Sequence, residues 1–168
     1  MTASTAPAIA PATYRIDPTR STVRFVAKGM FGLLPVRGTF TVREGTIVVA
    51  DDVTRSTVTA TVDAASVDTA NTRRDNDLRS KKYLDTARHP DILFASREVT
   101  PDSVTGILRV HGTDQRVTLT LAPESTPDGF RFTTSTRLDR YAFGVTGGKG
   151  GLVARHVDVE LEIVASRA

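Results

Sequence analysis

The stretch RHVDVELEIVA, residues 155–165, decides the fold. Polar and apolar side chains alternate strictly from His156 to Ile163. One face carries Val157, Val159, Leu161 and Ile163, and the other carries His156, Asp158, Glu160 and Glu162. Successive side chains of a β-strand point to opposite faces, so this period of two predicts a strand with one buried and one solvated face.

The same alternation recurs from Tyr14 onward. Further runs of this kind lie at residues 21–30, 36–45, 56–64, 91–99, 103–112, 116–122 and 129–138. Turn-forming sequences separate several of them: REG (43–45), DD (51–52), TPD (100–102) and TPDG (126–129). About eight short strands, each with one apolar face, predict an all-β fold that closes into an antiparallel barrel, because closure leaves no free edges. The interior of such a barrel is either filled with side chains or holds one small ligand.

Length and composition are those of one globular domain. The chain has 168 residues, 39% hydrophobic and 24% charged, and no run of ~18 apolar residues that would span a membrane. We read MTASTAPAIAPAT (1–13) as a disordered tail rather than a secretion signal, because it lacks a basic start and Pro7 and Pro11 interrupt it. The barrel domain is therefore expected at residues 14–168, in a cytoplasmic protein. The absence of cysteine excludes disulfides and thiol catalysis.

One basic segment interrupts the strand pattern. Residues 73–82 hold five basic and two acidic side chains, a surplus equal to the formal net charge of +3 of the whole chain. We predict one short helix around residues 72–82, with Thr72 and Asp75 forming a capping box and His89-Pro90 preventing its continuation. A localised patch suits a phosphate or an anionic surface better than a long nucleic-acid track.

The helical region and its flanks carry a family signature. AASVDTANTRRDNDLRSKKYLDTARHPDILFAS (64–96) resembles the signature of the YceI-like family of polyisoprenoid-binding, lipocalin-like proteins. The similarity extends from YRIDPTRSTVRFVAKG (14–29) through VTGILRVHGTDQRVTLTL (104–121) to RYAFGV (140–145) and the final strand. The Ser-x-Asp-Thr, Arg-Asp, Leu-Arg-Ser, His-Pro, His-Gly and Phe-Gly elements of the family appear in order.

This resemblance implies an eight-stranded lipocalin-like barrel with one helix and an apolar tunnel. The tunnel would take a long-chain isoprenoid, quinone or fatty-acid-like ligand without catalysis and without a cofactor, and a homodimer would be consistent with the family. Two features depart from the family pattern. Asp77 stands where the family usually has a histidine, and there is no signal peptide although the best-known members are periplasmic.

The inward faces of the predicted strands supply the candidate ligand-binding residues. They are Phe25, Phe40, Val42, Val58, Val62, Phe94, Leu108, Val110, Phe132, Val157, Val159 and Leu161, together with Phe143 of YAFGV (141–145), a segment that would close one end. The alternation alone favours a packed core, since most such strands bury one. The resemblance favours a tunnel instead.

The basic helix has two interpretations. Arg73, Arg74 and Arg79 are candidates for contact with a ligand headgroup or an anionic membrane. The alternative is structural: Arg74 and Asp75 would pair with barrel strands, while Lys81 and Lys82 would be solvated.

Two loops also have alternative interpretations. GMFGLLP (29–35) is an apolar loop that would form a tunnel lip or fold back onto the barrel end. GVTGGKGG (144–151) fails the spacing of a phosphate-binding loop and is read as a strand connection.

Catalytic, metal and nucleic-acid functions are disfavoured. His89, His111 and His156 are too scattered in sequence for a metal site, and no nucleophile motif or carboxylate pair stands out. The high isoelectric point suggests a nucleic-acid-binding barrel, but there is no tryptophan and most aromatic residues are in phase with the interior. A ligand-free barrel that serves structure or protein interaction is the remaining alternative.

Overall fold

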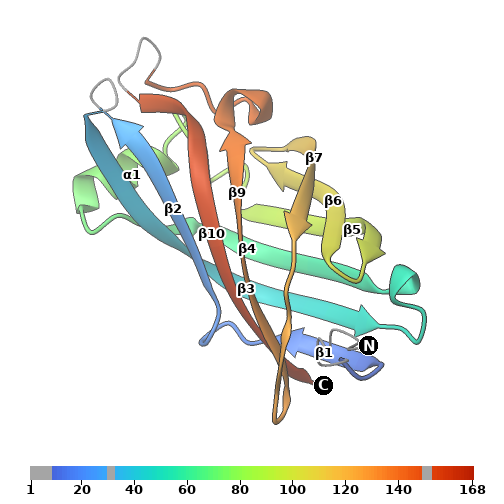
Figure 1. Ribbon diagram of the computed structural model, residues 1–168. Helices are drawn as coiled ribbons and strands as arrows, with labels where there is room; N and C mark the ends of the chain where they lie inside the picture. The colour runs from blue at the N-terminus through green and yellow to red at the C-terminus, as the bar shows by residue number, and fades with distance from the viewer. Residues whose placement is uncertain (1–8, 30–32, 149–152) are drawn as a thin grey trace.

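A computed structural model describes residues 9–29, 33–148 and 153–168 (Figure 1). They form one strongly curved antiparallel sheet with one α-helix and two 3₁₀ helices. The strands are β1 (Ala12–Ile16), β2 (Thr22–Gly29), β3 (Leu34–Val49), β4 (Thr57–Asp68), β5 (Asp91–Thr100), β6 (Ser103–Val110), β7 (Thr113–Thr120), β8 (Glu124–Thr126), β9 (Gly129–Asp139) and β10 (Val153–Arg167). The helices are α1 (Thr72–Arg79), η1 (Val53–Arg55) and η2 (Arg140–Phe143).

Nine of the ten described strands occupy eight places in the barrel wall. The sheet runs in the order β7-β6-β5-β4-β3-β1-β10-β9-β8. β1 and β2 each pair with both β3 and β10, at successive positions along these two strands. Together they fill one place in the wall. β8 has three residues and pairs only with β9. The predicted eight-stranded antiparallel barrel is therefore confirmed, with one wall position split and one short extra strand. The predicted complete closure is not found, because β7 and β9 are not paired with each other.

β3 runs through a segment that the sequence analysis had assigned to a turn. REG at 43–45 is not a turn, because β3 continues to Val49 and its pairing with β4 shifts register between Val42 and Glu44. A register shift of this kind is a bulge, which bends the strand and increases its twist. Gly45 lies at the bend, and a Cβ added there would come within 2.4 Å of the Ile16 side chain.

The N-cap of the helix lies one residue earlier than predicted. Asn71, not Thr72, is the N-cap, and its side chain accepts a hydrogen bond from the amide of Arg74. The predicted capping box is wrong because the Asp75 carboxylate accepts bonds from Thr69 instead. The helix also ends at Arg79, so Lys81 and Lys82 lie beyond it and are exposed, as the structural interpretation required.

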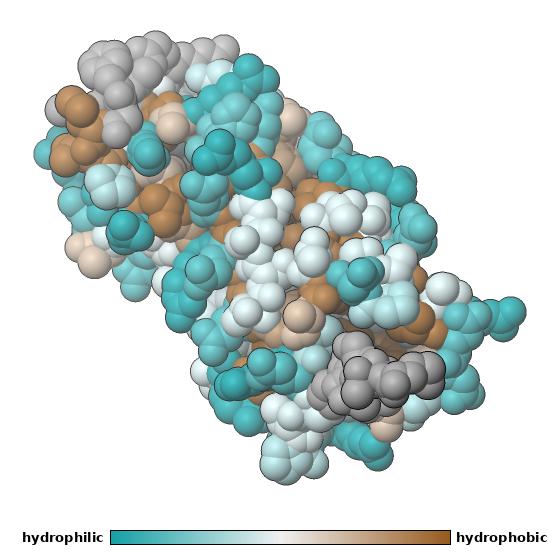
Figure 2. Space-filling view, viewed as in Figure 1, coloured by the Kyte–Doolittle hydropathy of each residue, from teal (hydrophilic) through white to brown (hydrophobic). Residues whose placement is uncertain are grey.

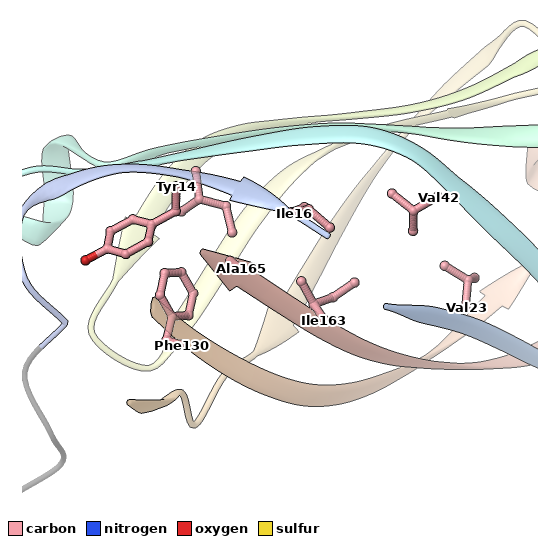
Figure 3. Packing of buried hydrophobic residues seen from close by; sticks show 8 residues of the cluster. Tyr14, Ile16, Val23, Val42, Phe130, Ile163 and Ala165 are labelled. Carbon is pink, nitrogen blue, oxygen red and sulfur yellow. The ribbon is translucent and has the colours of Figure 1, made fainter. Parts of the chain in front are cut away.

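The hydrophobic residues gather in the interior in three clusters. The largest lies where β1 meets β3, β9 and β10, and Figure 3 shows its side chains pointing toward one another between these strands. The rings of Tyr14 and Phe130 meet edge to face with centroids 4.9 Å apart, and the Tyr14 hydroxyl donates to Ala10 O. Several side chains of this cluster, among them Ile16 and Phe130, also line the interior of the barrel.

The described N-terminal residues belong to the barrel. β1 starts at Ala12, so the predicted tail (1–13) overlaps the first strand, and Ile9 packs against the largest cluster. Residues 1–8 lie outside the described part of the chain. Within that part, no helix is long and apolar enough to cross a membrane. The face seen in Figure 2 is mainly hydrophilic, with apolar residues in separate patches.

Candidate ligand-binding cavity

The barrel encloses a cavity of about 780 Å³. Ligand sites in proteins typically have volumes of ~300–1,000 Å³, so this cavity is large enough for one small molecule or one lipid chain. Side chains from β1–β7, β9 and β10 line it, and nearly all of them are aliphatic or aromatic. The interior is therefore not a filled core, and an apolar molecule would be stabilised along most of its length.

All thirteen side chains predicted to face inward line this cavity. They are Phe25, Phe40, Val42, Val58, Val62, Phe94, Leu108, Val110, Phe132, Phe143, Val157, Val159 and Leu161. The alternation of the strands was sufficient to find twelve of them, because the parity of a residue fixes which face of the sheet it occupies. Phe143 lies on η2 and was found in the YAFGV segment instead. That they contact a ligand stays a prediction.

Glycine leaves room for an aromatic ring at the cavity wall. Phe25 of β2 lies opposite Gly38 of β3, and a Cβ on Gly38 would come within 2.4 Å of the Phe25 ring. The Phe25 and Phe40 rings are 5.3 Å apart. Any larger residue at position 38 would push the Phe25 ring further into the cavity.

Polar groups are few among the lining residues, and most lie in or next to connections between strands. Asp51 and Ser56 flank η1, Thr100 ends β5, and Thr136 and Arg140 lie on β9 and η2. Of these five, Arg140 is a buried cation. The sequence analysis did not select it as a site residue, because nothing in RYAFGV distinguishes a buried arginine from an exposed one.

Arg140 is held by backbone carbonyl groups rather than by a carboxylate. Its Nε donates to Ala154 O at 2.8 Å, Nη1 to Val145 O at 2.9 Å and Nη2 to Val153 O at 3.0 Å. Burial lowers the pKa of the guanidinium, although the nearby Tyr141, Tyr83 and Asp139 side chains oppose that effect. An arginine has five N–H donors, so two remain for an acceptor brought by a ligand.

The residues around Arg140 form the apolar end of the cavity that YAFGV was expected to close. Tyr83, Phe143 and Val145 make a buried cluster there, with Leu78 of α1 packed against it. η2 is capped by Asp139, whose carboxylate accepts from the Tyr141 amide and from Arg155. The Arg155 side chain is the main reason that the pKa of Asp139 falls to about 2.

The three arginines of the basic helix do not line the cavity. Arg79 donates to Ala65 O and Val67 O of β4, and Arg74 donates to Oγ1 and O of Thr69. These contacts attach α1 to the barrel wall, and a contact of Arg74 or Arg79 with a headgroup or membrane stays a prediction. Arg73 is exposed on the helix, and its contact with a membrane stays a prediction.

Asp77 and the two loops lie outside the cavity lining or outside the described residues. Asp77, the departure from the family pattern, is exposed on α1 and does not line the cavity. Leu33 and Leu34 of GMFGLLP are 80% and 56% exposed, while Phe31 lies outside the described residues. Lys149 of GVTGGKGG also lies outside them.

Two histidines that the sequence analysis treated as scattered lie side by side. The ring centroids of His89 and His111 are 4.8 Å apart, and the Asp85 carboxylate is near both. The statement that the histidines are too scattered for a metal site is therefore wrong for this pair. Sequence distance did not find them because β5 and β6 bring the two segments together.

The fold and its apolar interior define the class of the protein, an antiparallel lipocalin-like barrel with room for a small molecule. The chain belongs to the YceI-like domain family, whose sequence model matches residues 14–165.

Two groups of curated sequences are similar to parts of the chain. Protein YceI of Escherichia coli O6:H1 is 41% identical over 66 residues, which cover 37% of this chain and 35% of that protein. A UPF0312 protein of Staphylococcus epidermidis is 31% identical over 103 residues, covering 59% of this chain and 58% of that one. The matched segments thus span about one third to three fifths of these relatives.

Solved structures are similar over almost the whole fold. BcnA of Burkholderia cenocepacia matches with a TM-score of 0.78 and 22% identity, covering 88% of this chain and 98% of that one. A polyisoprenoid binding domain from Saccharophagus degradans matches with a TM-score of 0.69 and 16% identity, covering 95% of this chain and all of that one. At these identities the likeness shows the barrel fold.

Proposed function

We propose that the protein binds one long-chain apolar amphiphile, such as an isoprenoid, in the barrel cavity, and stores, shields or carries it without chemical turnover. The observation that carries this proposal is the cavity of about 780 Å³ with a nearly continuous apolar lining. Membership of the YceI-like family and the likeness to a structure named as a polyisoprenoid binding domain support it. The expected cytoplasmic location and the membrane contact through Arg73 belong to the same proposal.

The energetics favour a long chain over a short one. Each buried methylene contributes ~0.8 kcal/mol, so ~10 buried carbons give roughly 8 kcal/mol of gross stabilisation. Association itself costs about 4–15 kcal/mol in lost translational and rotational freedom and in ordering. A ligand with ~20 buried carbons, worth about 16 kcal/mol gross, exceeds that cost, so length is the property that the cavity selects.

Arg140 indicates which end of the cavity takes the polar part of the ligand. The guanidinium is a buried cation with two N–H groups left for an acceptor, and it lies beside Tyr83 and Phe143 in the cavity wall. An anionic or carbonyl headgroup would gain a charge-assisted hydrogen bond there. We therefore propose that the headgroup lies at the Arg140 end and the chain extends toward Tyr14 and Phe130.

Native mass spectrometry of the purified protein, followed by organic extraction and lipid analysis, tests the proposal. We expect a bound species of defined mass, or saturable uptake of an added isoprenoid, quinone or fatty acid. Val159→Trp should abolish uptake because it places a large ring inside the cavity. The matched variant Ser135→Trp places the same ring on the outer face of the neighbouring strand and should bind like the wild type.

Two results would contradict the proposal. A protein that carries nothing and ignores all three added ligand classes would favour a barrel with a structural or protein-interaction role. Equal uptake by Val159→Trp and Ser135→Trp would show that an added lipid binds outside the cavity.

A further inference from the structure

We propose that Asp85, His89 and His111 form a binding site for a divalent transition-metal ion of the zinc type, which joins two connections of the barrel. One carboxylate oxygen and one nitrogen from each imidazole all lie within 4.8 Å of one another. Asp85 is buried, and both histidines are partly exposed. This site lies outside the cavity lining and does not depend on the proposed lipid function.

The segment after α1 brings Asp85 and His89 together. The Asp85 amide donates to Ser80 O at 2.9 Å, and the His89 amide donates to Asp85 O at 2.9 Å. This last bond closes one helical turn, so the two side chains, four residues apart, lie on the same side. Pro90 then starts the extended chain that leads into β5 at Asp91.

The β6–β7 turn supplies the third side chain. Val110 pairs with Thr113, so His111 and Gly112 form a two-residue hairpin turn, with φ of +55° and +70°. Leu93 of β5 pairs with Arg109 of β6, and the same register two residues further on places His111 beside the start of β5. The strand pairing thus sets His111 next to His89.

The identity of residue 111 is unusual for this turn. Both central positions of such a turn need positive φ, which asparagine or glycine adopts with the least strain. A histidine there stores strain, and strained residues cluster at functional sites. A Cβ on Gly112 would come within 2.9 Å of the His89 ring, so glycine at that position also leaves room for the imidazole.

The three side chains have almost no other partners. In the described parts of the chain neither imidazole makes a hydrogen bond, and the Asp85 carboxylate has only the Arg88 guanidinium at 4.0 Å. The Asp85 side chain is 9% exposed, and its oxygens, which make no hydrogen bond, are not sealed from solvent. They can therefore accept a metal ion without breaking a hydrogen bond within the protein.

The chemistry of the three ligands selects the ion. Two imidazoles and one carboxylate suit Zn²⁺, Co²⁺, Fe²⁺ and Ni²⁺, whereas Mg²⁺ and Ca²⁺ prefer sites made entirely of oxygen. Tetrahedral ligands at ~2.1 Å from a metal lie ~3.4 Å apart, so binding would draw the side chains closer together. Three protein ligands leave one position open for water or a small anion.

The site would stabilise the end of the barrel that holds Arg140. A Cβ on Gly144, the residue after η2, would lie 3.3 Å from Nδ1 of His111, so η2 is adjacent to the site. The Gln115 side chain of β7 also donates to Ala142 O of η2 at 2.9 Å. A metal ion here would join the α1–β5 connection to the β6–β7 turn beside η2.

Metal titration of the full chain, after treatment with a chelator, tests the site. We expect saturable binding of Zn²⁺ and of Co²⁺, the latter seen as a visible absorption band, and a higher melting temperature with metal. Mg²⁺ and Ca²⁺ should have no effect at equal concentration. His111→Asn and Asp85→Asn should weaken Zn²⁺ binding by at least ~100-fold, since each removes one ligand.

These variants separate loss of metal from loss of fold. Asparagine favours positive φ at both positions, so the metal-free melting temperature of His111→Asn and Asp85→Asn should not fall. His89→Phe keeps a ring beside Gly112 and is a third ligand variant, and His156→Asn, on the exposed face of β10, is the control. Absence of saturable binding, equal weakening in His156→Asn, or unchanged binding in all three ligand variants would overturn the proposal.

Discussion

At the scale of single residues, Asp75 shows how one buried carboxylate organises the start of the helix. Its Oδ1 accepts from the Thr69 amide at 2.9 Å and from the Thr69 hydroxyl at 2.5 Å. Burial raises the pKa of Asp75, but the Thr69 bonds and the charges of Arg79 and Arg74 outweigh it, so the pKa lies below 3.8. The ionised form is therefore the one that the fold requires.

Asp75→Asn should make stability less dependent on pH. Because the pKa of Asp75 in the fold lies below its unfolded value, its contribution is complete above about pH 5 and is lost as the pH falls through that folded pKa. At pH 7 we expect the variant to lose about 1–3 kcal/mol of unfolding free energy, since charge-assisted hydrogen bonds are worth about that much. The difference from the wild type should shrink below pH 4, measured by urea denaturation.

Asp77→Asn is the matched control, because it changes the same charge on an exposed position of the same helix. Its unfolding free energy at pH 7 should stay within about 0.5 kcal/mol of the wild type. A wild-type to Asp75→Asn difference that is constant from pH 7 to pH 3 would contradict this account of Asp75.

At the scale of elements, α1 is attached to the barrel mainly by polar contacts. Its sequence, TRRDNDLR, holds one large apolar side chain, Leu78, which packs against the cluster around Tyr83. The Arg79 guanidinium bonds to Ala65 O at 2.7 Å and to Val67 O at 3.0 Å of β4. Arg79 thus fixes α1 to the barrel wall.

Arg79→Met should loosen α1. It keeps a long side chain but removes the bonds to β4, so we expect a loss of about 1–3 kcal/mol in unfolding free energy and faster hydrogen exchange of the α1 amides. Arg73→Met removes the same charge from an exposed position on α1. Its unfolding free energy should stay within about 0.5 kcal/mol of the wild type. If both variants lose the same unfolding free energy, the change in net charge, and not the loss of the Arg79 hydrogen bonds, is responsible.

At the scale of the whole molecule, the barrel wall has one place where backbone pairing stops. Among the described strands β7 pairs with β6 alone, and β9 pairs with β10 and, at its start, with β8. β4, in contrast, is paired on both sides, with β3 and β5. The boundary between β7 and β9 is therefore the part of the wall with the least backbone support.

Hydrogen exchange should show this boundary. Amides of β7 (113–120) should exchange faster than those of β4 (57–68). β7 pairs on one side only, so about half of its amides have no carbonyl group of a neighbouring strand to bond to. An added lipid that fills the cavity should slow exchange in β7 more than in β4. Equal protection of both strands in the empty protein would show that the wall is closed more firmly than its pairing indicates.

The sequence by itself determined which side chains face the interior. Alternation such as that of Val157, Val159 and Leu161 is a local property, because the parity of a strand residue fixes its face wherever the strand lies. That local rule was enough for the barrel and for the twelve lining positions on strands. The break in alternation and the basic run also located the helix, although its N-cap is Asn71 and it ends at Arg79.

Only the tertiary structure decided what depends on contacts between distant segments. REG at 43–45 became a bulge and not a turn because β4 pairs across it. Arg140 became a buried cation because the carbonyl groups of Val145, Val153 and Ala154 surround it. His89 met His111 because β5 and β6 share a register. Periodicity assigns a face but no position along the barrel axis, and partners across that axis are set by strand pairing.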